Sequence, residues 1–379
     1  MVNLADLLEL LYLARSRWAT VQATLSDWTH VERSQRAYEH HLVQSGRVVG
    51  LSVGAAPTRD YPSEVTYSSR LWLAADGRFR QEKVGDWDGM TLVHDGEKAW
   101  IYTKESGAIE HETQTLAPSA SELFDPAVLI PALDLEPRDE AVVAGRPAHT
   151  VDARARGSTG PPVDLVPAGC DEVRLAVDAE RGVVLRIEAL FEGERVRLVE
   201  VEEIVFDGRI DADLFRFELP PGEEPRTAAE AYPTHNVTLE QAAREASFTV
   251  WSPARLPSRW RAHVLFRPET HRPRLPEVVT ILFSDTESLH HFGMEQAGER
   301  LLVWRTGDER LIERGEDELR VIGGDRLPGP PLEVHLRRET THIRIYSDNL
   351  DEAALIELAD TLEPAPTRQP PVSDRQRPD

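Results

Sequence analysis

Apolar and polar positions alternate along residues 171–220 in three successive runs. In the first two runs the apolar members are Val173, Leu175, Val177, Val183, Leu185, Ile187, Ala189 and Phe191, and a mixed run covers 196–206. Gly182 and Gly193 lie between the runs, where a hairpin needs the positive φ that glycine adopts readily. A period of two is typical of strands that bury one face. The segment therefore predicts three antiparallel strands.

A second set of alternating runs covers residues 65–104. Gly77 marks one of its turns, and the pair Asp95-Gly96 marks another with a strong hairpin signal. We expect these strands and those of 171–220 to be two parts of one curved antiparallel sheet. Such a sheet buries one face and leaves its second surface wet or free for another task.

Helical spacing appears at the start of the chain and twice near its end. The first series consists of Leu4, Leu7, Leu8, Leu11, Ala14, Trp18, Val21 and Leu25, and it predicts an amphipathic helix laid on a core. Thr238 and Gln241 predict a capping box for a later helix. Asn349 and Glu352 are the expected capping pair of the last helix.

The length of 379 residues is too great for one ordinary core. Pro, Gly, Glu and Ala replace the alternation over residues 219–236. We expect a first domain at 1–222, a linker at 223–236 and a β-rich α+β domain at 237–363. The tail at 364–379 is rich in proline and is expected to be disordered.

The net charge of −23 and the pI near 5.0 disfavour nucleic acid and anionic membrane surfaces as partners. Cys170 is the single cysteine, so an intrachain disulfide and a multi-cysteine metal site are both excluded. The chain opens without a secretion signal and contains no transmembrane run, so we expect a cytoplasmic protein unless the true start lies upstream. Only three of the 43 basic residues are lysines, which is typical of a GC-rich bacterial genome.

The sequence offers no convincing catalytic centre, cofactor motif or metal-ligand spacing. Ser52 lies in Gly50-Leu51-Ser52-Val53-Gly54, which fits the nucleophile-elbow pattern GxSxG. That chemistry needs a strand before the serine and a helix after it, and the following AAPTRDYP cannot start a helix. A flexible loop is the better interpretation, and we expect no enzyme and no cofactor.

Aromatic residues gather on the expected strands, at Trp72, Phe79, Trp100, Tyr102 and Phe191. They are explained either by a core packed against the N-terminal helix or by a concave apolar surface that holds a long hydrophobic ligand. Strand parity selects the candidate lining residues for such a ligand, which are Leu71, Leu73, Phe79, Leu92, Trp100, Leu185 and Ile187.

Several phrases resemble the bacterial outer-membrane lipoprotein carrier superfamily (LolA-like) and its sigma-factor regulatory relatives of the RseB type. They are RLWLAADGRFRQEK, LVHDGEKAWIYTKESGAIEH, AGRPAHTVDAR and the long run from LAVDAERG to FELPPG. The likeness covers roughly 1–222. It implies an α+β fold in which helices plug an unclosed antiparallel β-barrel. In that superfamily the hollow accepts acyl chains or serves as a sensor surface for lipoproteins.

The second domain resembles a β-rich bacterial domain of unknown function, through VTLEQAAREASFTVWSPARLPSRWR and LDEAALIELADTL. This likeness implies a smaller α+β fold and no mechanism. Three functions follow for the chain. The first is a non-catalytic binding protein for an acyl chain or another lipid. The second is a regulatory module with a filled core that binds a protein partner. The third, and weakest, is a hydrolase that uses Ser52.

Overall fold

A computed structural model describes residues 2–45, 62–85, 89–112, 118–156, 165–255, 258–271, 274–286, 290–298, 309–314, 317–322, 332–347 and 350–367. The chain forms two compact units. The first comprises Met1–Ser45 and Asp60–Ala231, and the C-terminal part of the second begins at Tyr232. The division falls inside the range 223–236, which carries β12 (Arg226–Thr227), α4 (Ala228–Ala231) and the start of β13 (His235–Val237).

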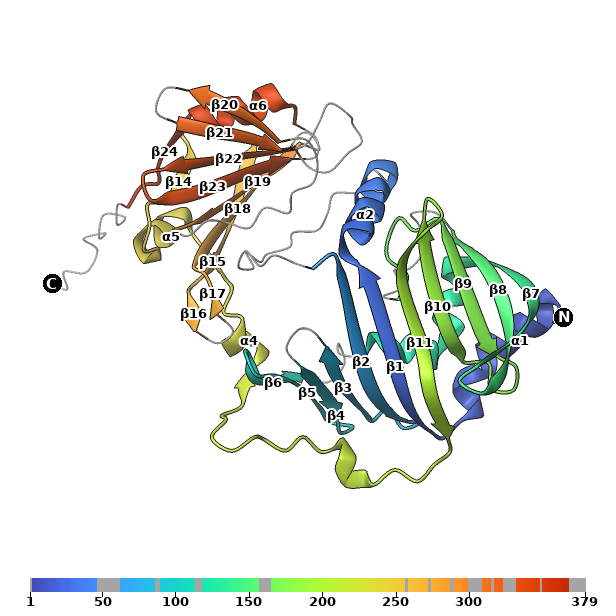
Figure 1. The fold of residues 1–379 in the computed structure, drawn as a ribbon. Coiled ribbons are helices and arrows are strands. Elements are labelled where there is room, and N and C mark those ends of the chain that lie inside the picture. The colour runs from blue at the N-terminus through green and yellow to red at the C-terminus, as the bar shows by residue number, and fades with distance from the viewer. Residues whose placement is uncertain are drawn as a thin grey trace. The chain divides into compact units, whose positions relative to one another are not determined.

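The first unit is built on one twelve-stranded sheet in the order β12-β6-β5-β4-β3-β2-β1-β11-β10-β9-β8-β7 (Figure 1). The strands are β1 (Thr20–His30), β2 (Glu64–Ala74), β3 (Phe79–Gly85), β4 (Met90–His94), β5 (Lys98–Thr103), β6 (Gly107–Glu112), β7 (Leu133–Val143), β8 (Arg146–Ala155), β9 (Glu172–Asp178), β10 (Val184–Phe191), β11 (Glu194–Phe206) and β12 (Arg226–Thr227). Neighbours are antiparallel except β12, which pairs with β6 in parallel. The expected single curved, unclosed sheet is confirmed, with β1 joining its two halves.

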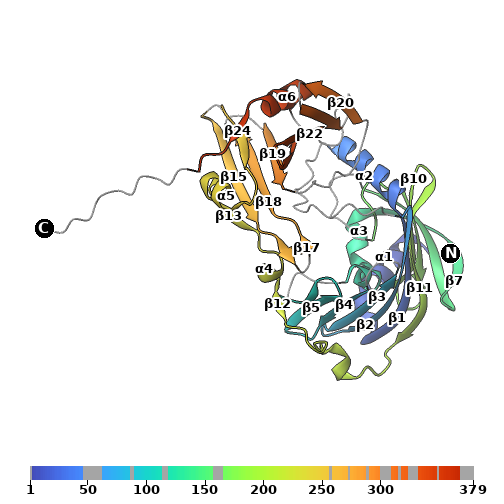
Figure 2. The same ribbon diagram turned by 60° about the vertical axis from the view of Figure 1, so that its left-hand side comes forward.

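Helices cover the concave face of this sheet (Figure 2). They are α1 (Leu4–Leu13), α3 (Leu129–Ala132) and the 3-10 turns η1 (Ala14–Arg17), η2 (Ser119–Leu123) and η3 (Pro126–Val128), here called the covering helices. α2 (Val31–Ser45) follows β1, and η5 (Ala212–Phe215) and α4 (Ala228–Ala231) follow β11. Leu7 and Leu11 of α1 are fully buried against the sheet, so the amphipathic helix supplies part of the core.

The N-terminal helix is shorter than its spacing predicts. α1 ends at Leu13, and Val21 and Leu25 lie on β1 instead. These two residues fit a helical period with Trp18, but with the buried Ala23 between them they also fit a period of two. Pairing of β1 with both β2 and β11 decides the outcome in favour of a strand.

The second unit has an eight-stranded sheet in the order β13-β15-β18-β19-β23-β22-β21-β20. Its elements are β13 (His235–Val237), α5 (Leu239–Glu245), β14 (Trp251–Pro253), β15 (Trp260–Arg267), β16 (Thr270–His271), β17 (Arg274–Leu275), β18 (Val278–Asp285), β19 (His291–Ala297), β20 (Glu309–Arg314), β21 (Asp317–Ile322), β22 (Leu332–Arg338), β23 (Thr341–Ser347), α6 (Glu352–Asp360) and β24 (Leu362–Pro364). α5 and α6 pack on one face of this sheet and close a separate core.

The capping box of Thr238 and Gln241 is confirmed, because both of its reciprocal hydrogen bonds form. The last helix is capped differently from the prediction. Asp351 accepts the hydrogen bond from the Ala354 amide at 2.8 Å, and Asn349 lies outside the described residues. The first part of the expected tail is also ordered, since Pro364 belongs to β24 and the neighbouring Ala365 is buried.

Candidate functional site

Strand register places most of the predicted lining residues on the concave face. Val21 lies opposite Leu73, Leu73 lies opposite Phe79, and Ile187 lies opposite Val199. Six of the seven candidates are between 0% and 7% exposed and belong to one cluster with residues of the covering helices; they are Leu71, Leu73, Phe79, Leu92, Leu185 and Ile187. The site is therefore an apolar sheet face with a helical cover packed directly onto it.

Trp100, the seventh candidate, lies on the outer face of the sheet. The register pairs Leu92 with Ile101 and Val93 with Trp100, so Ile101 is the residue of β5 that points toward the concave cluster. Trp100 stacks instead on Phe217, with ring centroids 5.3 Å apart and planes 15° from parallel. The parity assigned to β5 from the sequence was shifted by one residue, and a shift of one exchanges the two faces of a strand.

The cover is held to the sheet mainly where α1 passes into η1. Arg15 donates from Nη2 to the carbonyl oxygen of Ala75 at 2.6 Å, and its guanidinium lies 4.1 Å from the Trp18 ring centroid. Trp18 in turn donates to the carbonyl oxygen of Phe124 at 3.2 Å. α1 itself contributes the apolar side chains of Leu7, Leu10 and Leu11. Polar contacts thus fix one end of the cover, and apolar packing holds the helix.

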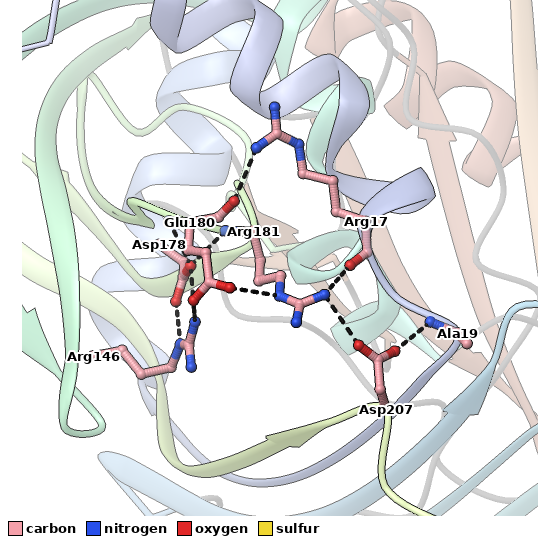
Figure 3. Close-up of polar contacts among 7 residues, drawn as sticks. All are labelled: Arg17, Ala19, Arg146, Asp178, Glu180, Arg181 and Asp207. Carbon is pink, nitrogen blue, oxygen red and sulfur yellow. Dashed lines mark hydrogen bonds and ion pairs between the residues drawn. The ribbon is translucent and has the colours of Figure 1, made fainter.

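A network of charged groups fixes the same corner (Figure 3). Arg181 bonds to the Arg17 carbonyl oxygen and to Asp207 Oδ2, the latter at 3.1 Å, while the Ala19 amide donates to Asp207 Oδ1 at 2.7 Å. The hydrogen bond from Ala19, helped by the charge of Arg181, lowers the pKa of Asp207. The network joins the end of η1, the start of β1, the end of β11 and the turn before β10.

The same turn is anchored to β8 by a buried ion pair. Asp178 is 0% exposed, accepts from Arg146 and also accepts the Glu180 and Arg181 amides. Arg146 reaches Glu180 as well, at 3.0 Å, and these contacts raise its pKa, the hydrogen bond to Asp178 most of all. The turn between β9 and β10, which bonds to the end of η1, is therefore itself held in place by several side-chain hydrogen bonds.

At the opposite end of β1 the concave face becomes polar. Asp27 continues the inward series of β1 beyond Leu25 and forms a two-point ion pair with Arg197 of β11, at 3.1 and 2.9 Å. Lys83 of β3 places its Nζ 3.7 Å from the Tyr67 ring centroid. Burial lowers the pKa of Lys83, against the attraction of Asp27. An apolar floor thus ends in a partly buried charged group.

Sequence reasoning missed this polar end. Its signal was present but weak: Asp27 follows Val21, Ala23 and Leu25, the apolar residues at the preceding inward positions of its strand. Arg197 and Lys83 lie on strands far away in the sequence, so only the order of strands in the sheet brings them to Asp27.

Other predicted groups fall elsewhere. Ser52 lies outside the described residues. Cys170 is buried near α2, and burial raises the pKa of its thiol to about 12, so it is a poor nucleophile. Among the residues that the structure describes, no three His, Cys, Asp or Glu side chains gather in a way that could hold a metal ion. No helix in the described ranges is long and apolar enough to cross a membrane.

Comparison with known proteins gives likenesses of fold. No family model matches the chain, and no curated protein matches it. The chain is similar to MucB of Pseudomonas aeruginosa, solved in complex with MucA, with 15% identity over 96% of this chain and 99% of that chain and a TM-score of 0.35.

Two further solved structures resemble a smaller part of the chain. One is a putative outer-membrane lipoprotein-sorting protein domain from Vibrio parahaemolyticus, with 10% identity over 56% of this chain and 97% of that chain and a TM-score of 0.25. The other is a LolA-superfamily protein from Nitrosomonas europaea, with 10% identity, coverages of 57% and 99% and a TM-score of 0.23. The Nitrosomonas europaea protein belongs to the LolA superfamily, the family whose likeness was expected for residues 1–222. At such values the likeness concerns the general fold and defines no ligand or partner for this chain.

Proposed function

We propose that this chain is a non-catalytic binding protein that takes an acyl chain or another long apolar molecule between the concave face of its first sheet and the covering helices. One observation carries the proposal. The concave face is an apolar floor that passes through the hydrogen-bonded pair Gln81 and Ser69 and ends in the charged group of Asp27, Lys83 and Arg197. An amphiphile has the same order of parts, with its chain on the floor and its polar end beside the cations.

The mode of entry follows from how the cover is held. The backbone hydrogen bonds of a helix are internal, so α1 can move without breaking any bond of the sheet. A bound chain would replace the side chains of Leu7 and Leu11 against the floor, and each buried CH₂ group contributes about 0.8 kcal/mol. The corner at Arg181 and Asp207 would act as the fixed end about which α1 swings.

The burial of these same side chains also favours a second function. Six candidate lining residues are already packed against the cover, as in a filled core. In that case the first unit would be a regulatory module, and a protein partner would bind its surface. The two functions differ in whether an apolar probe can enter.

The test is a titration with a fluorescent fatty acid. We expect saturable binding to the full chain and stronger binding to Leu7→Ala, because the shorter side chain leaves space under α1. Leu4→Ala is the matched control, since Leu4 is 45% exposed on the same helix and should change nothing. Ala23→Leu fills the concave face and should weaken binding.

Folding of each variant is checked by circular dichroism, because burial changes of this size cost about 1–5 kcal/mol. Absence of saturable binding to the folded wild type and to folded Leu7→Ala would overturn the ligand proposal and leave the filled-core module.

A further inference from the structure

The segment from Asp207 to Thr227, here called the strap, connects β11 to β12 and contacts β3 and β5 on the way. All of its residues are described, and Phe215 is the only one of them that is buried, at 2% exposure. A segment of this length with one buried side chain has little apolar area to hold it in place.

Two aromatic side chains anchor the strap to the sheet. The Phe215 ring lies 5.0 Å below the Arg78 guanidinium, and the next carbonyl back, that of Leu214, accepts from Arg80 at 3.4 Å. Phe217 stacks on Trp100 and lies 6.2 Å from the Tyr102 ring. On the outer face, Trp100 provides the ring on which Phe217 of the strap stacks.

The far end of the strap is fixed by a minimal strand. Arg226 and Thr227 pair in parallel with Ile109 and Glu110 of β6, and the Arg226 side chain donates to the Ser106 carbonyl oxygen. Between this end and Phe217 the chain contains Pro220, Pro221 and Pro225, which have no N–H to donate to the sheet. Undocking the strap would break the short pairing with β6 and the contacts of Arg80 and Arg226, and it would also release α4 with its buried Ala231. The pairing of β1 to β11 would stay intact.

We propose that the strap docks reversibly on the outer face and thereby sets the length of the tether between the two units. When it is docked, α4 also belongs to the first unit, and the chain toward the second unit begins at Tyr232. When the strap and α4 are released, the free chain begins after Gly208, whose carbonyl oxygen accepts from Thr20 at 2.7 Å. Each added residue extends the reach by up to about 3.3–3.6 Å. A longer tether lowers the effective concentration of one unit around the other.

The first arm of the test measures docking by hydrogen exchange of the β12 amides and of the amides of 208–219. Phe217→Ala removes the stack on Trp100 and should speed exchange by up to about tenfold, the loss expected for one aromatic pair. Phe217→Tyr keeps the stack and should restore the wild-type rate. Leu219→Ala is the matched control, since Leu219 is 41% exposed in the same segment.

The second arm measures reach by energy transfer between dyes at Tyr12→Cys and Leu311→Cys, two exposed positions in different units. Cys170 is buried and should not be labelled. We expect Phe217→Ala to shift the distance distribution to longer and broader values, and Leu219→Ala to leave it unchanged.

Unchanged hydrogen exchange in Phe217→Ala would show that the strap does not open. Faster exchange with an unchanged distance distribution would show that docking does not set the reach. Either result overturns the proposal.

Discussion

In the second unit the Arg344 guanidinium lies between two buried carboxylates. It contacts Glu295 at 3.0 Å and also binds Glu333, whose carboxylate accepts from His335 Nε2 at 2.7 Å. Burial raises the pKa of Glu295, although Arg344 opposes this effect. Such a group adds little net stability when complete, but loss of one partner leaves a buried charge unpaired.

Replacement of Arg344 by methionine should therefore destabilise the second unit by about 3–5 kcal/mol. Arg337→Met is the control, because Arg337 lies on the same strand pair, is exposed and donates to the Glu339 carbonyl oxygen at 3.2 Å. Urea unfolding compares the two variants. Equal losses of unfolding free energy in the two variants would show that removing Arg344 leaves no costly unpaired charge in the buried cluster.

Asp207 gives the first unit a defined pH dependence. The pKa of Asp207 is lower in the folded chain than in the unfolded chain. Its contribution to the free energy of unfolding is therefore fully present above the unfolded pKa and is lost as the pH falls through the folded pKa. We expect Asp207→Asn to lower the urea midpoint by the same amount at pH 7 and pH 5. Below about pH 4 the difference from wild type should shrink. Asp213→Asn, an exposed carboxylate beside Arg216, should show a much smaller effect at pH 7. A difference for Asp207→Asn that grows on acidification would contradict this account.

At the scale of elements, the position of α1 depends on how closely the turn between β9 and β10 approaches it. Gly182 has φ +75°, and a Cβ at this position would lie 2.1 Å from the Leu10 carbonyl oxygen. Gly193, in the next turn, has φ +76°, and a Cβ at this position would have no heavy atom within 4 Å. The two glycines share the backbone requirement, and only Gly182 also provides room for the helix.

Gly182→Ala should thus cost about 1–3 kcal/mol more than Gly193→Ala, the cost of forcing an atom into a packed contact. Both variants carry the strain of a positive φ, so the difference between their unfolding free energies isolates the contact with α1. The comparison is made by urea denaturation of the full chain. Equal losses would mean that α1 moves away freely, and that Gly182 does not fix the cover.

The elements themselves were largely readable from the sequence. Alternation at 173–191, with glycines at the turns, predicts β9 and β10 because both their faces and their turns follow local rules. Val21 and Leu25 fit a helical period with Trp18 and a period of two with Ala23. The end of the N-terminal helix was therefore decided only by the pairing of β1 in the sheet. The face of Trp100 could not be assigned because its partner, Phe217, lies in irregular chain. The pair Asp27–Arg197 spans 170 positions and arises only from the strand order.

At the scale of the whole molecule, the two units have separate cores. Changes in different cores with no shared partners usually add within about 0.3–0.5 kcal/mol. We expect Gly182→Ala to shift the unfolding of the first unit and Arg344→Met that of the second. The double variant should show the sum of the two effects. A coupling energy above about 1 kcal/mol would show that the units stabilise each other.

The central claim is that the first unit admits an apolar chain under its helical cover, and native mass spectrometry of the whole chain of 379 residues tests it most directly. The protein is purified without detergent and sprayed before and after addition of palmitate, beside Ala23→Leu as the filled control. The account predicts one fatty acid per chain in the wild type and a clear loss of that adduct in Ala23→Leu. A wild-type spectrum with no adduct, or with one equally abundant in Ala23→Leu, would contradict it.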